Sequence, residues 1–534
     1  MKLKYLLVIV LFIVSKTFSQ ENQSILFTID DESFYTQEFL AVYKKNLKTV
    51  DNSKTSIEKY LKLFVDYKLK VKEAKFLGLD TIQKYKNELR QYKNNLVLPY
   101  LKDKQVTKKL VNEVYSRLKK EVNVSHILIP LNPKALPKDT LIAYNLLIEA
   151  RNLIINGRSF SEIAKEYSKD PSVQDNEGKV GYFTALQMVY PFENVAYKTK
   201  LNEVSMPFKT KFGYHILKVN DIRDSKGEVE VAHIMFKNDS LVAKKKIDSV
   251  YNLLVNKESD FAVLAKKVSE DRASGMKGGK LNKFGYGRMI ESFSKVAFSL
   301  TTGGEISKPF KTQFGWHIAK LIKKYPIQSF DQIEAKLTQE VEKDKRSNLI
   351  SKSVVNKLFK QYNVVVNDKA LQQFEDIDWK ENSDKFTQNL LTVNGKNISQ
   401  AKFITYLKTV RNTPVNEAFM SFKEKQVLDY YKNNIEKSNP EFARTYKEFK
   451  EGLLLFDLLE KEVWNKAKDS TGLASYFNKN KARKYKSKEL KDIKGKVISD
   501  YQNYLEVEFS KQLQEKYEVK INKLEKKRIK KLKI

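Results

Sequence analysis

The chain of 534 residues carries 99 Lys and Arg against 65 Asp and Glu, a formal net charge of +34, and it contains no cysteine. The length predicts two to four domains. The absence of cysteine excludes disulfide bonds, thiolate catalysis and cysteine-based metal sites. The positive charge suggests nucleic acid as a partner. However, Lys and Glu alternate along most of the chain, which favours solvated helix faces instead.

The first residues have the pattern of a secretory signal. Two lysines precede the apolar run 5–14, and Thr17 and Ser19 place small side chains at the positions that a signal peptidase reads. The run is shorter than the roughly 20 apolar residues that a membrane span needs, which argues against an uncleaved anchor. We therefore expect residues 1–19 to be a cleaved signal peptide. The mature protein would be periplasmic, with neither a stable membrane anchor nor nucleic acid as a partner.

The region 20–121 is expected to be mainly helical after a short strand at 25–29. Apolar residues recur at spacings of three or four over 57–77, as on one face of a helix, and Gly78 should end that helix. Helices so rich in aromatic residues usually contribute to a core. In a protein that holds other chains, some of these aromatics would instead line a groove.

A stretch of sequence then occurs twice, over 122–223 and 228–325. The first copy opens with Val-Asn-Val-Ser-His-Ile-Leu-Ile and closes with Pro-Phe-Lys-Thr-Lys-Phe-Gly-Tyr-His-Ile. The second opens with Val-Glu-Val-Ala-His-Ile-Met-Phe and closes with Pro-Phe-Lys-Thr-Gln-Phe-Gly-Trp-His-Ile. The only histidines of the chain stand at the two ends of the two copies: His126, His215, His233 and His317. This placement indicates two sites of one kind.

Each copy has the pattern of a small antiparallel sheet wrapped by helices. Alternating residues over 122–129 predict a strand, and helical patterns and a returning strand follow. Ser159 and Glu162 have the spacing of a capping box at the start of one of these helices. The expected fold class is therefore α+β and multidomain, with the two copies between mainly helical N- and C-terminal regions.

The C-terminal region, 326–534, is expected to be mainly helical, including the segment 329–362, with a short strand at 364–366. Two weak echoes connect it to other parts of the chain. One relates the strand–turn–helix pattern at 29–39 to the pattern at 393–403, and the other relates 358–366 to 513–521. Together they suggest a related core without the repeated copies. The basic tail 523–534 is expected to fray.

Several separated motifs of the second copy resemble the parvulin family of peptidyl-prolyl cis–trans isomerases. They include Leu281-Asn-Lys-Phe-Gly-Tyr-Gly-Arg-Met-Ile-Glu-Ser-Phe293 and Lys311-Thr-Gln-Phe-Gly-Trp-His-Ile318. The first copy repeats them in the same order. The whole arrangement resembles the SurA-type periplasmic folding chaperones. Outside the two copies this resemblance is architectural.

The resemblance implies a polar network and an apolar proline pocket in each copy, without a cofactor or metal. The implied network residues are His233, Asp271, Thr312 and His317 in the second copy and His126, Asp170, Thr210 and His215 in the first. The implied pocket residues are Leu281, Met289, Phe293 and Phe314 in the second copy and Val180, Met188, Phe192 and Phe212 in the first. Family members often carry Cys where these copies have Asp, but active members with Asp also exist. The first copy departs further, because its loop 173–179 has lost most glycines and Val180 is small. We therefore expect the second copy to be the more active.

This chemistry is physically plausible without a nucleophile. Rotation about an X-Pro bond crosses a barrier of about 18–20 kcal/mol, and a thousandfold acceleration requires about 4 kcal/mol. An apolar pocket that grips the proline ring and desolvates the amide, together with one hydrogen bond to the twisted state, could supply that amount.

Other interpretations of the histidines remain open. Two His and one Asp could form a facial metal triad, although no local pair at i, i+4 spacing supports one. The histidines could also be ordinary core residues of an inactive scaffold, which would make the protein a non-catalytic chaperone. A Ser-His-Asp hydrolase is disfavoured, because no nucleophile-elbow motif is present.

The sequence thus predicts a peptidyl-prolyl isomerase and chaperone for unfolded or partly folded exported polypeptides, especially outer-membrane proteins. Client binding is expected in the flanking helical regions, with a salt-sensitive attraction for acidic clients. The sequence leaves the oligomeric state open.

Overall fold

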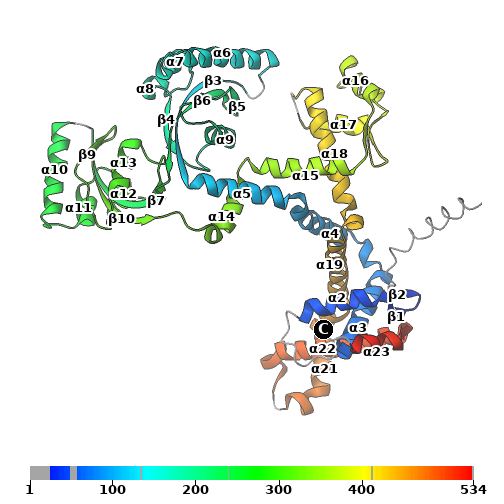
Figure 1. The fold of residues 1–534 in the computed structure, drawn as a ribbon. Coiled ribbons are helices and arrows are strands. Elements are labelled where there is room, and N and C mark those ends of the chain that lie inside the picture. The colour runs from blue at the N-terminus through cyan, green and yellow to red at the C-terminus, as the bar shows by residue number, and fades with distance from the viewer. Residues whose placement is uncertain are drawn as a thin grey trace, which may run out of the picture. The chain divides into compact units, whose positions relative to one another are not determined.

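Figure 1 shows the fold in a computed structural model of the chain. The structure describes residues 24–47, 57–132, 135–238, 240–410, 413–486 and 488–531. The expected signal peptide, residues 1–19, lies outside these ranges. The chain forms two compact units, one from residues up to 99 with those from 428 onward, the other from residues 100–427. No helix in the described ranges is long and apolar enough to cross a membrane.

The first unit contains a small sheet built from both ends of the chain, which we call the terminal module. Its antiparallel strands have the order β14-β1-β2. They span Ile25–Ile29 (β1), Glu32–Tyr35 (β2) and Val519–Ile521 (β14). The helices of this module are α2 (Thr36–Leu47), α3 (Ile57–Phe76), α22 (Leu490–Lys516) and α23 (Lys523–Lys530). The strand at 25–29 and the helix that ends before Gly78 are confirmed. Gly78 adopts a left-handed φ of 70°, which suits a residue without Cβ.

The basic tail does not fray as expected. Residues 523–530 form α23, which Asn522 caps by accepting hydrogen bonds from the backbone of Leu524 and Glu525. Ile529 inserts into the core of the terminal module beside the strands. One apolar residue in a highly charged segment therefore anchors the helix, and this contact is not visible in the composition.

The second unit contains a sheet of the same design, the internal module, with strand order β11-β12-β13. Its strands span Val364–Val366 (β11), Asn389–Val393 (β12) and Lys396–Ser399 (β13). Its helices are α15 (Ser347–Gln361), α16 (Asp368–Asp376), α17 (Gln400–Leu407) and α18 (Val415–Ser438), which continues past the boundary of the unit. Phe374, Phe403 and Phe422 pack in its centre, with ring centroids 4.9 Å apart for Phe403 and Phe422.

The two modules match in register, which confirms both sequence echoes. Ile29 pairs with Val519 in the terminal module, and the equivalent Val393 pairs with Val364 in the internal module. The chain order of the parts differs. In the terminal module the β-hairpin precedes its third strand by nearly the whole chain, whereas in the internal module the third strand comes first.

The two repeated copies of the sequence form two similar domains within the second unit. The first has the sheet order β4-β3-β6-β5 and the second has β8-β7-β10-β9. The strands of the first are β3 (Lys120–Pro130), β4 (Lys179–Phe183), β5 (Phe208–Thr210) and β6 (Gly213–Asp224). The strands of the second are β7 (Glu228–Lys237), β8 (Phe284–Gly285), β9 (Phe310–Thr312) and β10 (Gly315–Tyr325).

Helices cover both faces of each sheet (Figure 1). In the first domain α6 and α7 share one apolar cluster with Ile127 and Ile216, while α9 packs with Val124 and Leu217 on the other face. The helices of the first domain are α6 (Pro137–Ile155), α7 (Phe160–Tyr167), α8 (Val173–Asn176) and α9 (Tyr190–Lys198). Those of the second are α10 (Leu241–Val255), α11 (Phe261–Val268), α12 (Arg272–Gly275) and α13 (Glu291–Ser299). Alternation along the central strands explains this layering, because neighbouring residues point to opposite faces.

One local expectation is wrong. Ser159 precedes α7 as predicted, but its hydroxyl bonds the hydroxyl of Ser161 at 2.8 Å and makes no cap to the helix backbone. The segment 329–362 is helical as expected and consists of two helices, α14 (Phe330–Lys343) and α15, separated by a turn at Asp344–Arg346. The side chain of Asp344 turns back to bond the backbone N–H of Arg346 at 2.9 Å, which offers the chain an alternative to continuing the helix.

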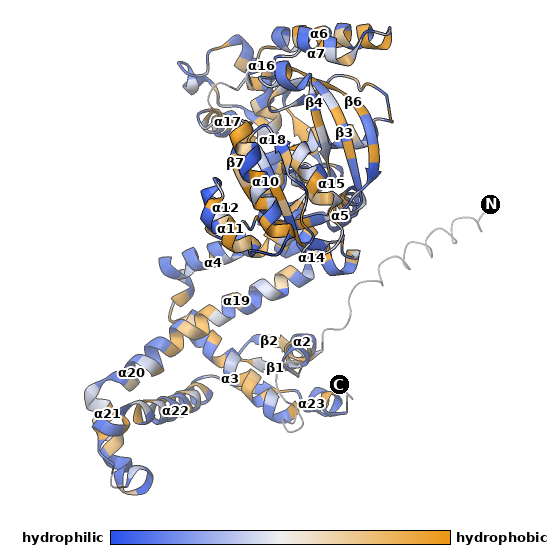
Figure 2. Ribbon diagram, turned by 90° about the vertical axis from the view of Figure 1, so that its left-hand side faces the viewer, coloured by the Kyte–Doolittle hydropathy of each residue, from blue (hydrophilic) through white to orange (hydrophobic). Residues whose placement is uncertain are grey.

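Other helices complete the units. The second unit begins with α5 (Lys104–Leu118), which packs with α14 and α15 in an apolar cluster. The first unit also contains α4 (Gln83–Leu96), α19 (Pro440–Leu459), α20 (Asn465–Lys468) and α21 (Ser470–Asn480). Along the long helices hydrophobic and hydrophilic residues alternate in bands, as amphipathic helices require (Figure 2).

The pairing of the chain ends can be tested by cross-linking, because the chain has no cysteine of its own. Thr28 faces Lys520 across β1 and β14, and opposite residues of antiparallel strands lie within disulfide range. We expect Thr28→Cys with Lys520→Cys to form a disulfide under mild oxidation, detected by a change in gel mobility. Thr392→Cys with Val365→Cys should do the same in the internal module. Cross-linking of Thr392→Cys with Lys520→Cys would contradict this strand pairing.

Candidate active site

The second of the two repeated domains brings its expected network residues together. His233 on β7 and His317 on β10 lie on one face of the sheet, with stacked rings 5.7 Å apart and a distance of 3.4 Å between their Nδ1 atoms. The Nε2 of His317 lies 2.8 Å from the hydroxyl of Thr312, and the Nε2 of His233 lies 2.8 Å from Asp271. The hydroxyl of Ser274 lies 2.9 Å from the same Nε2 of His233. The five side chains form one continuous network.

The direction of this network follows from its chemistry. Asp271 is an acceptor when ionised, so the Nε2 of His233 carries a proton and donates. The Nδ1 of a neutral His233 then accepts, and the Nδ1 of His317 donates to it. The Nε2 of His317 is left to accept from the hydroxyl of Thr312. This assignment satisfies the donors and acceptors from Thr312 to Asp271 with both histidines neutral.

The first domain has the same residues but a weaker network. Thr210 lies 2.8 Å from the Nε2 of His215, and the rings of His126 and His215 stack at 5.7 Å. The Nε2 of His126 is 3.3 Å from Asp170, and the Nδ1 atoms of both histidines are buried without a hydrogen-bond partner. The position that corresponds to Ser274 is Val173, three residues after the aspartate. The link between the two histidines is therefore missing in the first domain.

Burial keeps the histidines neutral. Desolvation, followed by the proximity of the other histidine, lowers the pKa of His215 and His317 to about 4. Desolvation also lowers the pKa of His126 and His233, although the aspartates oppose it. Burial alone would raise the pKa of Asp271, but hydrogen bonds from Ser274 and His233 outweigh it and lower this pKa below its ordinary value.

An aromatic ring closes each network against an apolar cluster. Phe293 on α13 stands edge-on to both histidines of its domain, with ring centroids 5.6 and 5.7 Å away. Leu281 and Met289 pack in the same cluster. In the first domain Phe192 on α9 stands in the same relation to its histidines at 5.7 Å. Val180 and Met188 pack with it as expected.

Phe212 and Phe314 lie apart from the other expected pocket residues. Their side chains are 51% and 55% exposed, on the turns before β6 and β10, and neither belongs to the apolar clusters. Phe208 and Phe310 take the inner places and stack on His215 and His317 at 5.4 and 5.5 Å. Strand alternation carried this signal, because Phe310 and Thr312 are two residues apart on β9 and so share a face.

No three His, Asp or Glu side chains among the described residues are arranged to hold a metal ion. In the second domain the histidine nitrogens and Asp271 instead bond one another and the two hydroxyls.

Comparison with known proteins identifies both domains. Residues 126–221 and 233–323 match the rotamase family of PPIC-type peptidyl-prolyl isomerase domains. These two segments are therefore parvulin-type isomerase domains.

Individual relatives indicate what kind of protein carries them. The chain is 41% identical over 157 residues to foldase protein PrsA 1 of Bacillus cereus, which covers 29% of this chain and 49% of that protein. It is 30% identical over 224 residues to the chaperone SurA of Pseudomonas fluorescens, covering 40% of this chain and 52% of that one. A crystal structure of the PrsA isomerase from Bacillus anthracis is 27% identical to this chain, with a TM-score of 0.19. The match covers 25% of this chain and 60% of the chain in that structure. The chain thus spans about half the length of these curated relatives. It contains two parvulin domains and is similar over part of its length to SurA chaperones and PrsA foldases.

The low pKa values of His215 and His317 predict how their rings titrate. The folded-state pKa of about 4 lies below the ordinary histidine pKa of about 6.5. The unfolded state therefore binds protons first, and folding loses stability as pH falls from about 6.5 to about 4. Each lowered pKa accounts for at most about 3 kcal/mol of the free energy of folding. We expect ring NMR signals of both histidines to remain in the neutral form at pH 5.5 in the folded chain. Titration of either signal near 6.5 would show that burial does not hold it neutral.

Proposed function

We propose that the protein is an exported peptidyl-prolyl cis–trans isomerase and chaperone that assists the folding of exported polypeptides, including outer-membrane proteins, in the periplasm. The observation that carries the isomerase part is the continuous network from Thr312 to Asp271 beside the ring of Phe293. The SurA and PrsA relatives support the chaperone part. The signal-like start of the sequence supports export.

The site suits a reaction that breaks no covalent bond. The apolar cluster around Phe293 would receive the proline ring and remove water from the amide, which favours the twisted state over the resonance-stabilised planar one. Next to it, the network has a fixed direction and neutral histidines, so it presents polar atoms without a mobile charge. Because these groups are already oriented, they would require little reorganisation when the bond rotates.

We assign most of the activity to the second domain, because its network is complete. Phe293→Ala should remove the platform for the proline ring and lower kcat/KM on a short X-Pro peptide by roughly 100-fold, a loss of about 2.7 kcal/mol of transition-state stabilisation. Phe192→Ala is the matched variant in the first domain and should have a small effect. Met289→Ala, at a partly buried position, checks the result if Phe293→Ala disturbs folding. A larger loss from Phe192→Ala than from Phe293→Ala would reverse the assignment.

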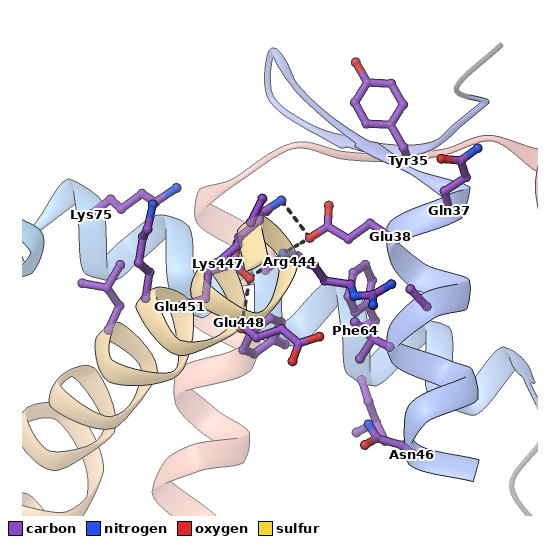
Figure 3. Close-up of a pocket in the computed structure, with 18 of the residues that line it drawn as sticks. Tyr35, Gln37, Glu38, Asn46, Phe64, Lys75, Arg444, Lys447, Glu448 and Glu451 are labelled. Carbon is purple, nitrogen blue, oxygen red and sulfur yellow. Dashed lines mark hydrogen bonds and ion pairs between the residues drawn. The ribbon is translucent and has the colours of Figure 1, made fainter. Parts of the chain in front are cut away.

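We place the binding of unfolded clients outside the isomerase pockets, in the first unit. A pocket of about 1120 Å³ lies there between α2, α3 and α19 (Figure 3). Phe64 and Leu63 contribute apolar surface, and the charged side chains Glu38, Lys447 and Glu451 stand beside them. Extended apolar and aromatic surface with charges at its edge suits weak binding of many sequences.

Lys68 holds the charged side of this pocket in place. Its buried ammonium bonds Glu38 at 2.5 Å and Glu451 at 2.7 Å, which joins α2 and α3 to α19. Burial would raise the pKa of Glu38, but Lys68 lowers it below its ordinary value. Lys447 also bonds Glu38, at 2.9 Å, so the two lysines together balance the two carboxylates. Arg444, which lines the same pocket, is then left to face an acidic client.

Leu63 allows a mild test of this site, because its side chain is 61% exposed and its replacement should not disturb the core. Leu63→Ser should weaken suppression of the aggregation of an unfolded outer-membrane protein several-fold and leave X-Pro peptide isomerisation unchanged. Leu241→Ser, an exposed leucine at the start of α10, is the control. Equal losses from both variants, or a loss only from Phe293→Ala, would place client binding in the parvulin domains.

A further inference from the structure

A buried carboxylate stands directly behind the pocket of the first parvulin domain. Glu193 follows Phe192 on α9, and its side chain is 0% exposed. The guanidinium of Arg117 donates to its Oε1 at 2.9 Å, and that of Arg346 donates to its Oε2 at 2.9 Å. A charge buried to this degree is stable only when paired, and removing one partner usually destabilises strongly.

Both arginines lie outside the parvulin domain. Arg117 lies in the last turn of α5, and Arg346 lies in the turn between α14 and α15. The side chain of Arg346 is also fully buried. Its Nε donates to Asp344 at 2.7 Å, and its guanidinium lies over the ring of Tyr190 at 4.6 Å. These contacts hold Arg346 rigid, so Glu193 is bound to a fixed point of the surrounding helices.

Glu193 also determines the path of the chain into α9. Its Oε2 accepts a hydrogen bond from the backbone N–H of Leu186 at 2.8 Å, and Leu186 has a positive φ of 65°. A branched residue rarely adopts this conformation without support. The loop held in this way leads to Met188, and the helix that follows carries Phe192. Both residues belong to the apolar cluster of the first pocket.

The second domain lacks this arrangement. The residue after Phe293 is Ser294, also fully buried, and its hydroxyl donates only to the carbonyl of Met289 at 3.1 Å. In the described parts of the chain, no ion pair joins α13 to α5, α14 or α15. The second pocket therefore has no charged attachment to these helices, although Gln187 of the first domain donates to the carbonyl of Tyr286 at 3.2 Å.

We propose that Glu193 is a positioning residue that fixes the proline pocket of the first domain to the helices α5, α14 and α15 through Arg117 and Arg346. The geometry of the first pocket thus depends directly on the surrounding helices, whereas no ion pair fixes the second pocket to them. The expected effect on peptide binding rests on the proposed prolyl-binding role of Phe192. The positioning of Phe192 by Glu193 does not depend on that role.

The four histidines provide a direct readout in the full-length protein. Each ring contacts the phenylalanine of its own domain, so a movement of Phe192 changes the ring-current shifts of His126 and His215 alone. Glu193→Gln keeps the shape of the side chain and removes its charge. We expect it to shift the ring NMR signals of His126 and His215 and to leave those of His233 and His317 unchanged. In a Phe293→Ala background it should also weaken the binding of an X-Pro peptide several-fold.

Two further variants make the result decisive. Arg346→Lys keeps the charge but loses the paired guanidinium bonds, so it should cause the same selective shift in smaller measure. If Glu193→Gln fails to fold, the histidine signals of Arg346→Lys test the proposal instead. Ser294→Ala, the matched change in the second domain, should leave His126 and His215 unchanged. Unchanged signals of His126 and His215 in a folded Glu193 or Arg346 variant, or equal shifts of all four histidines, would overturn the proposal. Because the NMR readout needs no catalytic turnover, this failure is distinct from a failure of the isomerase assignment.

Discussion

Antiparallel pairing between strands that are distant in the sequence is the constraint on which this structure depends. Each active-site network exists because β3 pairs with β6, or β7 with β10, and so places two histidines from opposite ends of a domain on one face. The terminal module depends on the same interaction, since β1 pairs with β14 from the other end of the chain. Such pairings cost loop-closure entropy before any contact compensates it, although that cost grows only slowly with loop length.

The two parvulin domains show how similar sequences give sites of different quality. Both have His, His, Asp and Thr at equivalent places, yet only in the second are the Nδ1 atoms bonded. Ser274, where the first domain has Val173, supplies a hydroxyl between Asp271 and His233. The first domain instead has a charged connection to the surrounding helices through Glu193. The second domain thus has the complete hydrogen-bond network, and the first has the charged attachment to the surrounding helices.

The helices around the parvulin domains accommodate them as insertions. Parvulin domains enter the framework between α5 and α14, and the ends of each domain lie side by side, as the pairing of Lys120 with Asp224 and Glu228 with Tyr325 shows. A domain inserted at adjacent points need not distort its host. The internal module has a three-stranded sheet like that of the terminal module, and no parvulin domain is inserted among its described residues.

The sequence by itself determined that two similar domains each carry one histidine near either end, because the repeated motifs and the four rare histidines are local features. The aspartates, threonines and pocket residues followed only from the resemblance to the parvulin family. The sequence also matched the two modules, through spacing alone. Only the tertiary structure decided which strands pair, because each hairpin of a module could pair with either equivalent third strand. It also decided that Phe310 rather than Phe314 lies against His317, that Ile529 anchors the tail, and that Glu193 meets Arg346 across 153 residues. These contacts form between segments far apart in the chain, and no local pattern specifies them.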